Sequence, residues 1–171
     1  VQRVVKLIEP HDSVDRYSAM GVDCLSGSAR ILSPYEVEVD GRVLTTKNIV
    51  VATGARPFVP NLPGLHQVNF LTSDNVWDLR GLPPRLTVLG GGAIGCELAQ
   101  AFARLGSKVT LIEMSSRIMS REDNEVSELM TNRLVTEGVR VLTNYKASRV
   151  EVRSGEKFVA CSTEQPVEGA L

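Results

Sequence analysis

The sequence lacks the features that mark several common classes of protein. Its three cysteines, Cys24, Cys96 and Cys161, are far apart, which excludes a Cys-x-x-Cys pair, zinc-type spacing and a disulfide framework. A net charge of −1 gives no electrostatic basis for binding nucleic acid or a membrane surface. No apolar run approaches the roughly 18 residues of a transmembrane helix, and the N-terminus has no signal-peptide pattern. Sparse, odd cysteines suit a reducing compartment, so we expect a cytoplasmic protein.

The most informative segment that is present runs from residue 86 to residue 113. The residues Leu-Thr-Val-Leu-Gly-Gly-Gly-Ala-Ile-Gly at 86–95 are followed by a helical pattern to about residue 105 and by the apolar run 109–113. This order predicts a strand, a turn, a helix and a second strand, which is the dinucleotide-binding βαβ unit of an α/β, Rossmann-like fold. Gly90 suits the tight turn. Gly92 allows the backbone to approach a pyrophosphate closely, and Gly95 allows the helix to pack closely on the strand.

An acidic residue stands where such a unit binds the adenosine ribose. Glu113 follows Gly95 by 18 residues and ends the second predicted strand. A carboxylate there accepts hydrogen bonds from both ribose hydroxyls and repels a 2′-phosphate, so NAD is the expected cofactor. Arg117 and Arg121 are expected on a solvated face near the ribose, and they keep NADP open as the lesser alternative because arginine can bind a 2′-phosphate.

The remaining sequence predicts two unequal parts, 1–70 and 71–171. We expect a helix over 1–20 that is broken near Pro10, short strands at 22–25, 29–32, 35–39, 42–45 and 48–53, and a proline-rich connection over 54–64. After it we expect a short helix from residue 72 or 73 to 79, a helix capped near Ser120 that ends at 137, a parallel strand at 139–142, and antiparallel strands at 147–152 and 157–162. The end of the sequence, 166–171, is where a further strand would begin.

Several of these motifs together resemble the flavin-dependent pyridine nucleotide-disulfide oxidoreductases. They are Ile-Val-Val-Ala-Thr-Gly-Ala-Arg-Pro at 49–57, Leu-Gly-Gly-Gly-Ala-Ile-Gly-Cys-Glu-Leu at 89–98, and Arg-Ile-Met-Ser-Arg-Glu-Asp at 117–123. Within that family the sequence looks most like the dihydrolipoamide dehydrogenase and mercuric reductase branch. The resemblance implies hydride exchange between a nicotinamide and FAD, with electrons passing to a disulfide-type acceptor, and a homodimer held by a C-terminal domain.

The resemblance also implies roles for particular residues. Backbone at Gly92, Ala93 and Ile94 would contact the NAD pyrophosphate, Glu97 would lie beside the nicotinamide, and Ala147 would line the adenine site. Four further positions match contacts to the adenine and ADP end of FAD: Ala29, Ala52, Thr53 and Gly54.

Other expected features of the family do not occur in this sequence. We find no N-terminal glycine fingerprint for FAD, no redox-active Cys-x4-Cys and no catalytic His-Glu pair. We therefore expect a fragment that contains the end of an FAD domain and most of an NAD domain, inactive by itself. Two alternatives stay open: a ferredoxin- or oxygen-linked FAD reductase of the same architecture, and a dinucleotide-sensing regulatory domain without flavin.

Overall fold

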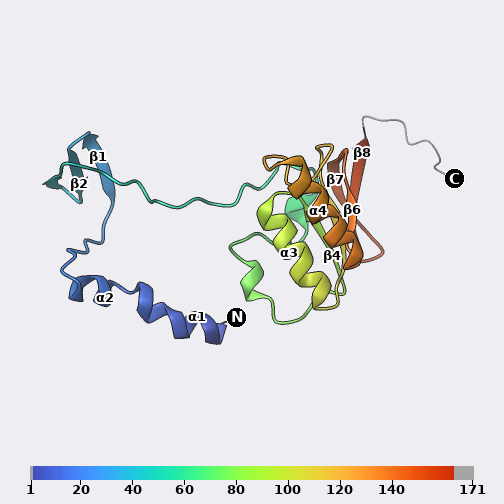
Figure 1. Ribbon diagram of the computed structural model, residues 1–171, viewed down its shortest axis with the longest axis horizontal. Helices are drawn as coiled ribbons and strands as arrows, with labels where there is room; N and C mark the ends of the chain where they lie inside the picture. Colours follow the sequence, from blue (N-terminus) through green and yellow to red (C-terminus); the bar gives the residue numbers. More distant parts are fainter. Residues whose placement is uncertain (1, 164–171) are drawn as a thin grey trace. The chain divides into compact units, whose positions relative to one another are not determined.

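The computed structural model describes residues 2–163, which form two compact units that divide between Arg56 and Pro57 (Figure 1). The predicted connection at 54–64 spans this division. The assignment of 1–70 and 71–171 to two binding domains stays a prediction, and the strand expected near 166–171 lies outside the described residues. In the described part no helix is long and apolar enough to cross a membrane.

The first unit contains two helices and a small antiparallel sheet. Helix α1 (Gln2–Ile8) and helix α2 (Val14–Ala19) are separated by a 3-10 turn at Glu9–Asp12, which confirms the predicted break near Pro10. The sheet comprises β1 (Ala29–Ser33), β2 (Glu36–Val39) and β3 (Arg42–Thr45), in that order, as predicted. No side chain from residue 3 to residue 56 is buried, so this unit has no core of its own.

Two predicted strands of the first unit do not form. Residues 22–25 and 48–53 have no strand structure, and the side chains of Val50 and Val51 are 87% and 65% exposed. An apolar, β-branched run becomes a strand only when a neighbouring backbone pairs with it, and no described strand does so here. Ala52, Thr53 and Gly54 therefore lie in a segment without strand structure rather than at a strand end.

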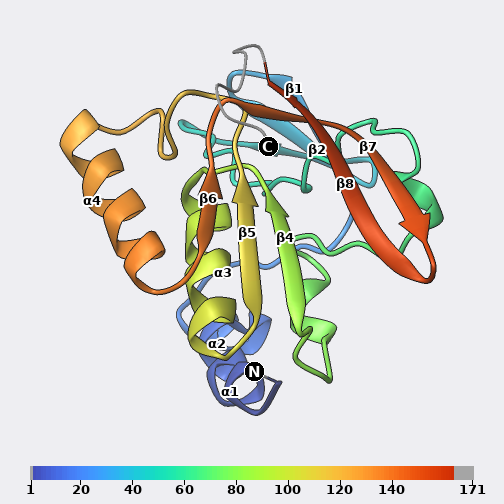
Figure 2. The ribbon, with the colours of Figure 1, turned by 90° about the vertical axis from the view of Figure 1, so that its right-hand side faces the viewer.

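The second unit is built on a parallel sheet. Strands β4 (Arg85–Leu89), β5 (Lys108–Ile112) and β6 (Arg140–Leu142) are ordered β4-β5-β6, so β5 is central (Figure 2). Helix α3 (Ala93–Arg104) connects β4 to β5, and helix α4 (Asn124–Thr136) connects β5 to β6. This arrangement confirms the predicted Rossmann-like α/β fold.

The core of the second unit lies between this sheet and its helices. Cys96 and Ala99 of α3, Val109 and Leu111 of β5, and Leu134 of α4 are buried in one cluster. Alternate residues of a strand share a face, so Val109 and Leu111 point the same way, and the i to i+3 spacing of Cys96 and Ala99 gives α3 one buried stripe. Cys96 is thus a small buried hydrophobic residue, as a cysteine in this pattern predicts.

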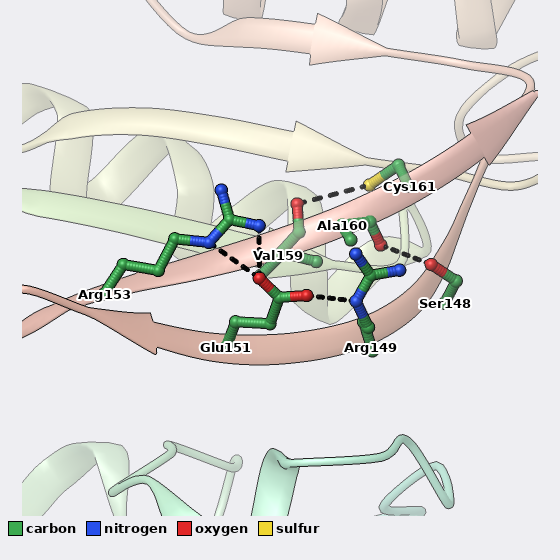
Figure 3. Close-up of polar contacts among 7 residues, drawn as sticks. All are labelled: Ser148, Arg149, Glu151, Arg153, Val159, Ala160 and Cys161. Atoms are coloured by element: carbon green, nitrogen blue, oxygen red, sulfur yellow. Dashed lines mark hydrogen bonds and ion pairs between the residues drawn. The ribbon is translucent and has the colours of Figure 1, made fainter.

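A hairpin follows the parallel sheet, as predicted. Strands β7 (Tyr145–Arg153) and β8 (Glu156–Thr163) pair antiparallel, and Val150 of β7 has a buried side chain. On the opposite, solvated face Glu151 forms ion pairs with Arg149 and Arg153 (Figure 3). Val150 N–H donates to Pro63 O over 2.8 Å, which ties the end of the connection at 54–64 to the hairpin.

Two local predictions in the second unit are wrong. The helix expected from residue 72 or 73 to residue 79 is only a 3-10 turn at Val76–Asp78, because the backbone at Leu79 turns to a ψ of 132° and ends the helical bonding. Another 3-10 turn forms at Leu65–Gln67. Helix α4 begins after Asp123 rather than near Ser120, because residues 119–122 form a loop around the guanidinium of Arg117.

Candidate functional site

The glycine turn connects β4 to α3 at the carboxyl end of the parallel sheet. Gly90 has a φ of +104°, a conformation that side chains rarely adopt, and its N–H donates to Ile112 O over 2.8 Å. The turn is therefore fixed to the end of β5, beside Glu113.

Gly92 and Gly95 differ in what surrounds them. A Cβ on Gly95 would lie 2.0 Å from Gly90 O, so α3 approaches the turn as closely as only glycine allows. A Cβ on Gly92 would meet nothing within 4 Å. The space in front of Gly92 is open, which is where the sequence places a pyrophosphate.

The N-terminus of α3 presents free hydrogen-bond donors at this turn. Its N-cap is Gly92, which has no capping side chain, and the first helical bond runs from Cys96 N–H to Gly92 O at 2.9 Å. Among the described residues, no acceptor is recorded for the N–H groups of Ala93 and Ile94. Uncapped donors at the positive end of a helix dipole favour an anion such as a phosphate.

Glu113 lies beside the turn and is held by two backbone donors. Its Oε2 accepts the N–H of Gly91 and its Oε1 accepts the N–H of Ser115, each at 2.7 Å. Partial burial raises the pKa of Glu113, but the hydrogen bonds from Ser115 and Gly91 outweigh it, so the pKa lies below its usual value. The carboxylate is therefore ionised at neutral pH, where it accepts hydrogen bonds and donates none.

Gly91 is a member of this site that the glycine pattern alone did not identify. Its N–H donates to Glu113, and its carbonyl accepts Met119 N–H at 2.7 Å and Cys96 Sγ at 3.4 Å. A Cβ on Gly91 would lie 2.7 Å from Ile118 Cγ2. The only sequence signal is that Gly91 is the middle of three consecutive glycines, and the contacts that require a glycine there come from a loop distant in sequence.

The other residues that the sequence predicts for the two cofactor sites lie on several elements. Glu97 is exposed on α3, and Ala147 is half-buried on β7, which begins where Tyr145 N–H donates to Glu113 O at 3.0 Å. Ala29 begins β1 in the first unit, which also contains Ala52, Thr53 and Gly54. The site roles of all these residues remain predictions.

The two arginines after Glu113 occupy different environments. Arg121 is exposed, as predicted, and no hydrogen bond is recorded for it among the described residues. Arg117 is half-buried and its guanidinium donates to backbone carbonyls of its own loop, so the prediction that it lies on a solvated face is wrong. Of these two arginines, Arg121 is the one whose guanidinium has no partner among the described residues.

Among the described residues, the turn is accompanied by no ionised thiol and no metal cluster. Burial, and then the nearby carboxylates of Glu113 and Glu97, raise the pKa of Cys96 to about 11, so this thiol is not ionised at neutral pH. Within residues 2–163 no group of three His, Cys, Asp or Glu side chains is placed to hold a metal ion. A surface hollow of about 510 Å³, lined by residues 68–71, 75 and 78–80, lies apart from the turn.

The fold and the turn define this chain as an α/β protein with a Rossmann-like unit. The family described as "Pyridine nucleotide-disulphide oxidoreductase" matches residues 7–170, and the chain belongs to that family. Its curated relatives include a mercuric reductase from Bacillus cereus, 42% identical over 77% of this chain and 21% of the relative. A dihydrolipoyl dehydrogenase from Mycoplasma pneumoniae is 41% identical over 74% of this chain and 29% of the relative.

Solved structures share the fold. The HOCl-induced flavoprotein disulfide reductase RclA from Escherichia coli, in its Cu(II) complex, aligns with a TM-score of 0.75 and 28% identity over 96% of this chain and 38% of that chain. A water-forming NADH oxidase from Lactobacillus brevis bound to NADH aligns with a TM-score of 0.57 at 21% identity over 78% of this chain and 33% of that chain, which shows the fold alone. The chain thus spans about a fifth to two fifths of the length of these proteins.

Proposed function

We propose that this chain binds the nicotinamide dinucleotide of a flavin-dependent oxidoreductase and holds the nicotinamide for hydride exchange with FAD. The observation that carries the proposal is the open turn at Gly92, flanked by the uncapped start of α3 and by the ionised Glu113. The family uses FAD and a pyridine nucleotide, and the residues present fit the pyridine nucleotide.

Each part of the site has a distinct task in this proposal. Backbone N–H groups of Ala93 and Ile94 bind pyrophosphate oxygens at the positive end of α3. Gly90 and Gly95 hold the backbone in the shape that leaves this space open. Glu97, exposed on α3, faces the nicotinamide, and Ala147 lines the adenine side. The reduced nicotinamide, when bound, supplies a hydride to the flavin, and this chain contributes position and charge.

We propose NADH rather than NADPH as the preferred dinucleotide. The ionised Glu113 carboxylate can accept hydrogen bonds from the ribose hydroxyls, while its negative charge repels a 2′-phosphate. Arg117, the nearer arginine in sequence, is engaged by carbonyls of its own loop. The balance of charge at the ribose therefore opposes NADPH.

The acceptor of the electrons is proposed from the sequence relatives. The curated relatives above, 41% and 42% identical to this chain, are a mercuric reductase and a dihydrolipoyl dehydrogenase, which favours a disulfide-type centre in a longer polypeptide. A ferredoxin reductase from Rhodopseudomonas palustris is only 23% identical and supports the fold alone. In such a polypeptide Ala29, Ala52, Thr53 and Gly54 would contact FAD, and the active form would be a homodimer.

Glu113→Gln tests the proposed site and cofactor. Removing the charge and one strong acceptor is expected to weaken NADH binding about tenfold or more, because hydrogen bonds to a carboxylate are stronger than those to an amide. Affinity for NADPH is expected to rise relative to NADH. Isothermal titration calorimetry of the 171-residue chain with each dinucleotide measures both changes.

The matched control is Glu128→Gln, which removes an equal charge from an exposed position on α4. It should leave both affinities unchanged. Tighter binding of NADPH than NADH by the unaltered chain would refute the cofactor preference, and absence of binding by either would refute the site.

A further inference from the structure

The loop that follows Glu113 is anchored to the glycine turn. Met119 N–H donates to Gly91 O over 2.7 Å, and the Ile118 side chain fills the space where Gly91 lacks a Cβ. Ile118 is completely buried, and its carbonyl accepts the hydroxyl of Ser127, itself 2% exposed, at 2.7 Å. The loop therefore connects the turn to α4 through buried contacts.

Arg117 gives this loop its shape. One guanidinium nitrogen, Nη1, donates to Met119 O at 3.1 Å and to Glu122 O at 2.9 Å, while Nη2 donates to Ser120 O at 2.9 Å. No carboxylate pairs with it among the described residues. A planar guanidinium can satisfy several carbonyls from one fixed position, which the single ammonium of lysine does poorly.

Met119 is the link between Arg117 and the turn. It adopts a φ of +50°, which non-glycine residues rarely do. Both of its polar backbone groups are used: the N–H donates to Gly91 O, and the carbonyl accepts from Arg117 and from Glu122 N–H at 2.9 Å. A residue in a strained backbone conformation persists where its surroundings hold it on several sides. Such residues are frequent at functional sites.

We propose that Arg117 is a positioning residue of the dinucleotide site, which holds Met119 against Gly91 and thereby fixes the turn that receives the pyrophosphate. Because Gly91 N–H also donates to Glu113, the same contacts orient the carboxylate toward the ribose. The arginine acts through backbone and does not contact the nucleotide. This inference rests on the proposed function of the turn.

Three variants of the 171-residue chain test it: Arg117→Met, Arg117→Lys and, as the matched control, Arg121→Met in the exposed part of the same loop. In Arg117→Met we expect hydrogen-exchange protection of the Met119 amide to fall at least about tenfold and NADH affinity to fall about tenfold, since small displacements of positioning groups are costly. The ratio of NADH to NADPH affinity and the protection of Val109–Leu111 amides should stay constant. Arg117→Lys should recover part of both losses, and Arg121→Met should leave NADH affinity and Met119 protection unchanged.

Three results would overturn the proposal. The first is an unchanged NADH affinity in folded Arg117→Met. The second is a loss of hydrogen-exchange protection in β5 as large as that at Met119. The third is a loss of affinity for NADPH alone, which would make Arg117 a phosphate ligand. If Arg117→Met does not fold, Arg117→Lys is judged by the same measurements. If the unaltered chain binds neither dinucleotide, the proposed function fails, while the Met119 amide still decides whether Arg117 fixes the turn.

Discussion

The glycines of the turn show how single residues divide one motif into different tasks. Gly95 removes a clash with Gly90 O, Gly91 makes room for Ile118, and Gly92 leaves open space. Two of these requirements are internal to the fold, and the third exists only toward a ligand. Sequence spacing assigns Gly92 to the pyrophosphate and Gly95 to packing, but it gives Gly91 no task, because the neighbour of Gly91 comes from a loop more than 20 residues away.

This division predicts that two small substitutions affect stability and binding to different degrees. Gly95→Ala should lower the free energy of unfolding by about 1–3 kcal/mol, because α3 must shift to relieve the overlap. Gly92→Ala should lower it by less than about 1 kcal/mol, the scale of a changed N-cap, yet weaken NADH binding by placing a methyl group in the phosphate space.

Urea denaturation and calorimetry on both variants measure the two effects. Equal losses of stability would contradict the packing role of Gly95, and unchanged NADH affinity in Gly92→Ala would contradict the open phosphate space.

At the scale of elements, the two helices of the second unit are joined through one carboxylate. Glu137, just after α4, accepts two hydrogen bonds from Arg104 of α3 at 2.6 and 2.7 Å and also pairs with Arg133 of α4 at 2.5 Å. The hydrogen bonds from Arg104 lower the pKa of Glu137 to about 2. This contact holds α3 and α4 together across residues that are far apart in sequence.

The stability supplied by Glu137 should depend on pH. Its folded pKa is depressed from an ordinary 4.5, so the contribution is fully present above about pH 4.5 and is lost as pH falls toward about 2. Glu137→Gln should therefore lower the Tm at pH 7, and its difference from the unaltered chain should shrink through that window. Differential scanning calorimetry at several pH values measures this change.

Glu128→Gln, on the exposed surface of α4, is the control and should show no such dependence. A constant Tm difference for Glu137→Gln from pH 7 to pH 2 would disprove the role of its charge.

At the scale of the molecule, the two units differ in how completely they are formed. The second unit has a buried core between sheet and helices, whereas residues 3–56 bury no side chain. Elements that cannot bury an apolar face contribute little stability by themselves. We propose that the first unit is part of an FAD domain. In a longer polypeptide, the rest of that domain would cover the apolar side chains that are exposed here.

Hydrogen exchange of the chain should reproduce this difference. The amides of β5 (Lys108–Ile112), paired on both sides, should exchange slowest, and those of residues 48–53 should exchange at rates close to those of an unstructured peptide, because they lack strand partners. Mass spectrometry of peptic fragments resolves the two segments. Strong protection over 48–53 would instead show that this apolar run pairs with a sheet edge, for instance the free side of β4.

The sequence by itself determined the βαβ unit, the hairpins at 29–45 and 145–163, and the break near Pro10, because hydrophobic period, glycine spacing and turn residues are local signals. It also placed Glu113 at the end of β5. It overestimated strands at 22–25 and 48–53, which have no pairing partner among the described strands, and the helix at 72–79, where the backbone leaves the helical path at Leu79. Only the tertiary structure showed that Gly91, Met119 and Arg117 form one support beneath the turn, since that support depends on a loop folding back onto a strand end, and no local pattern encodes such a contact.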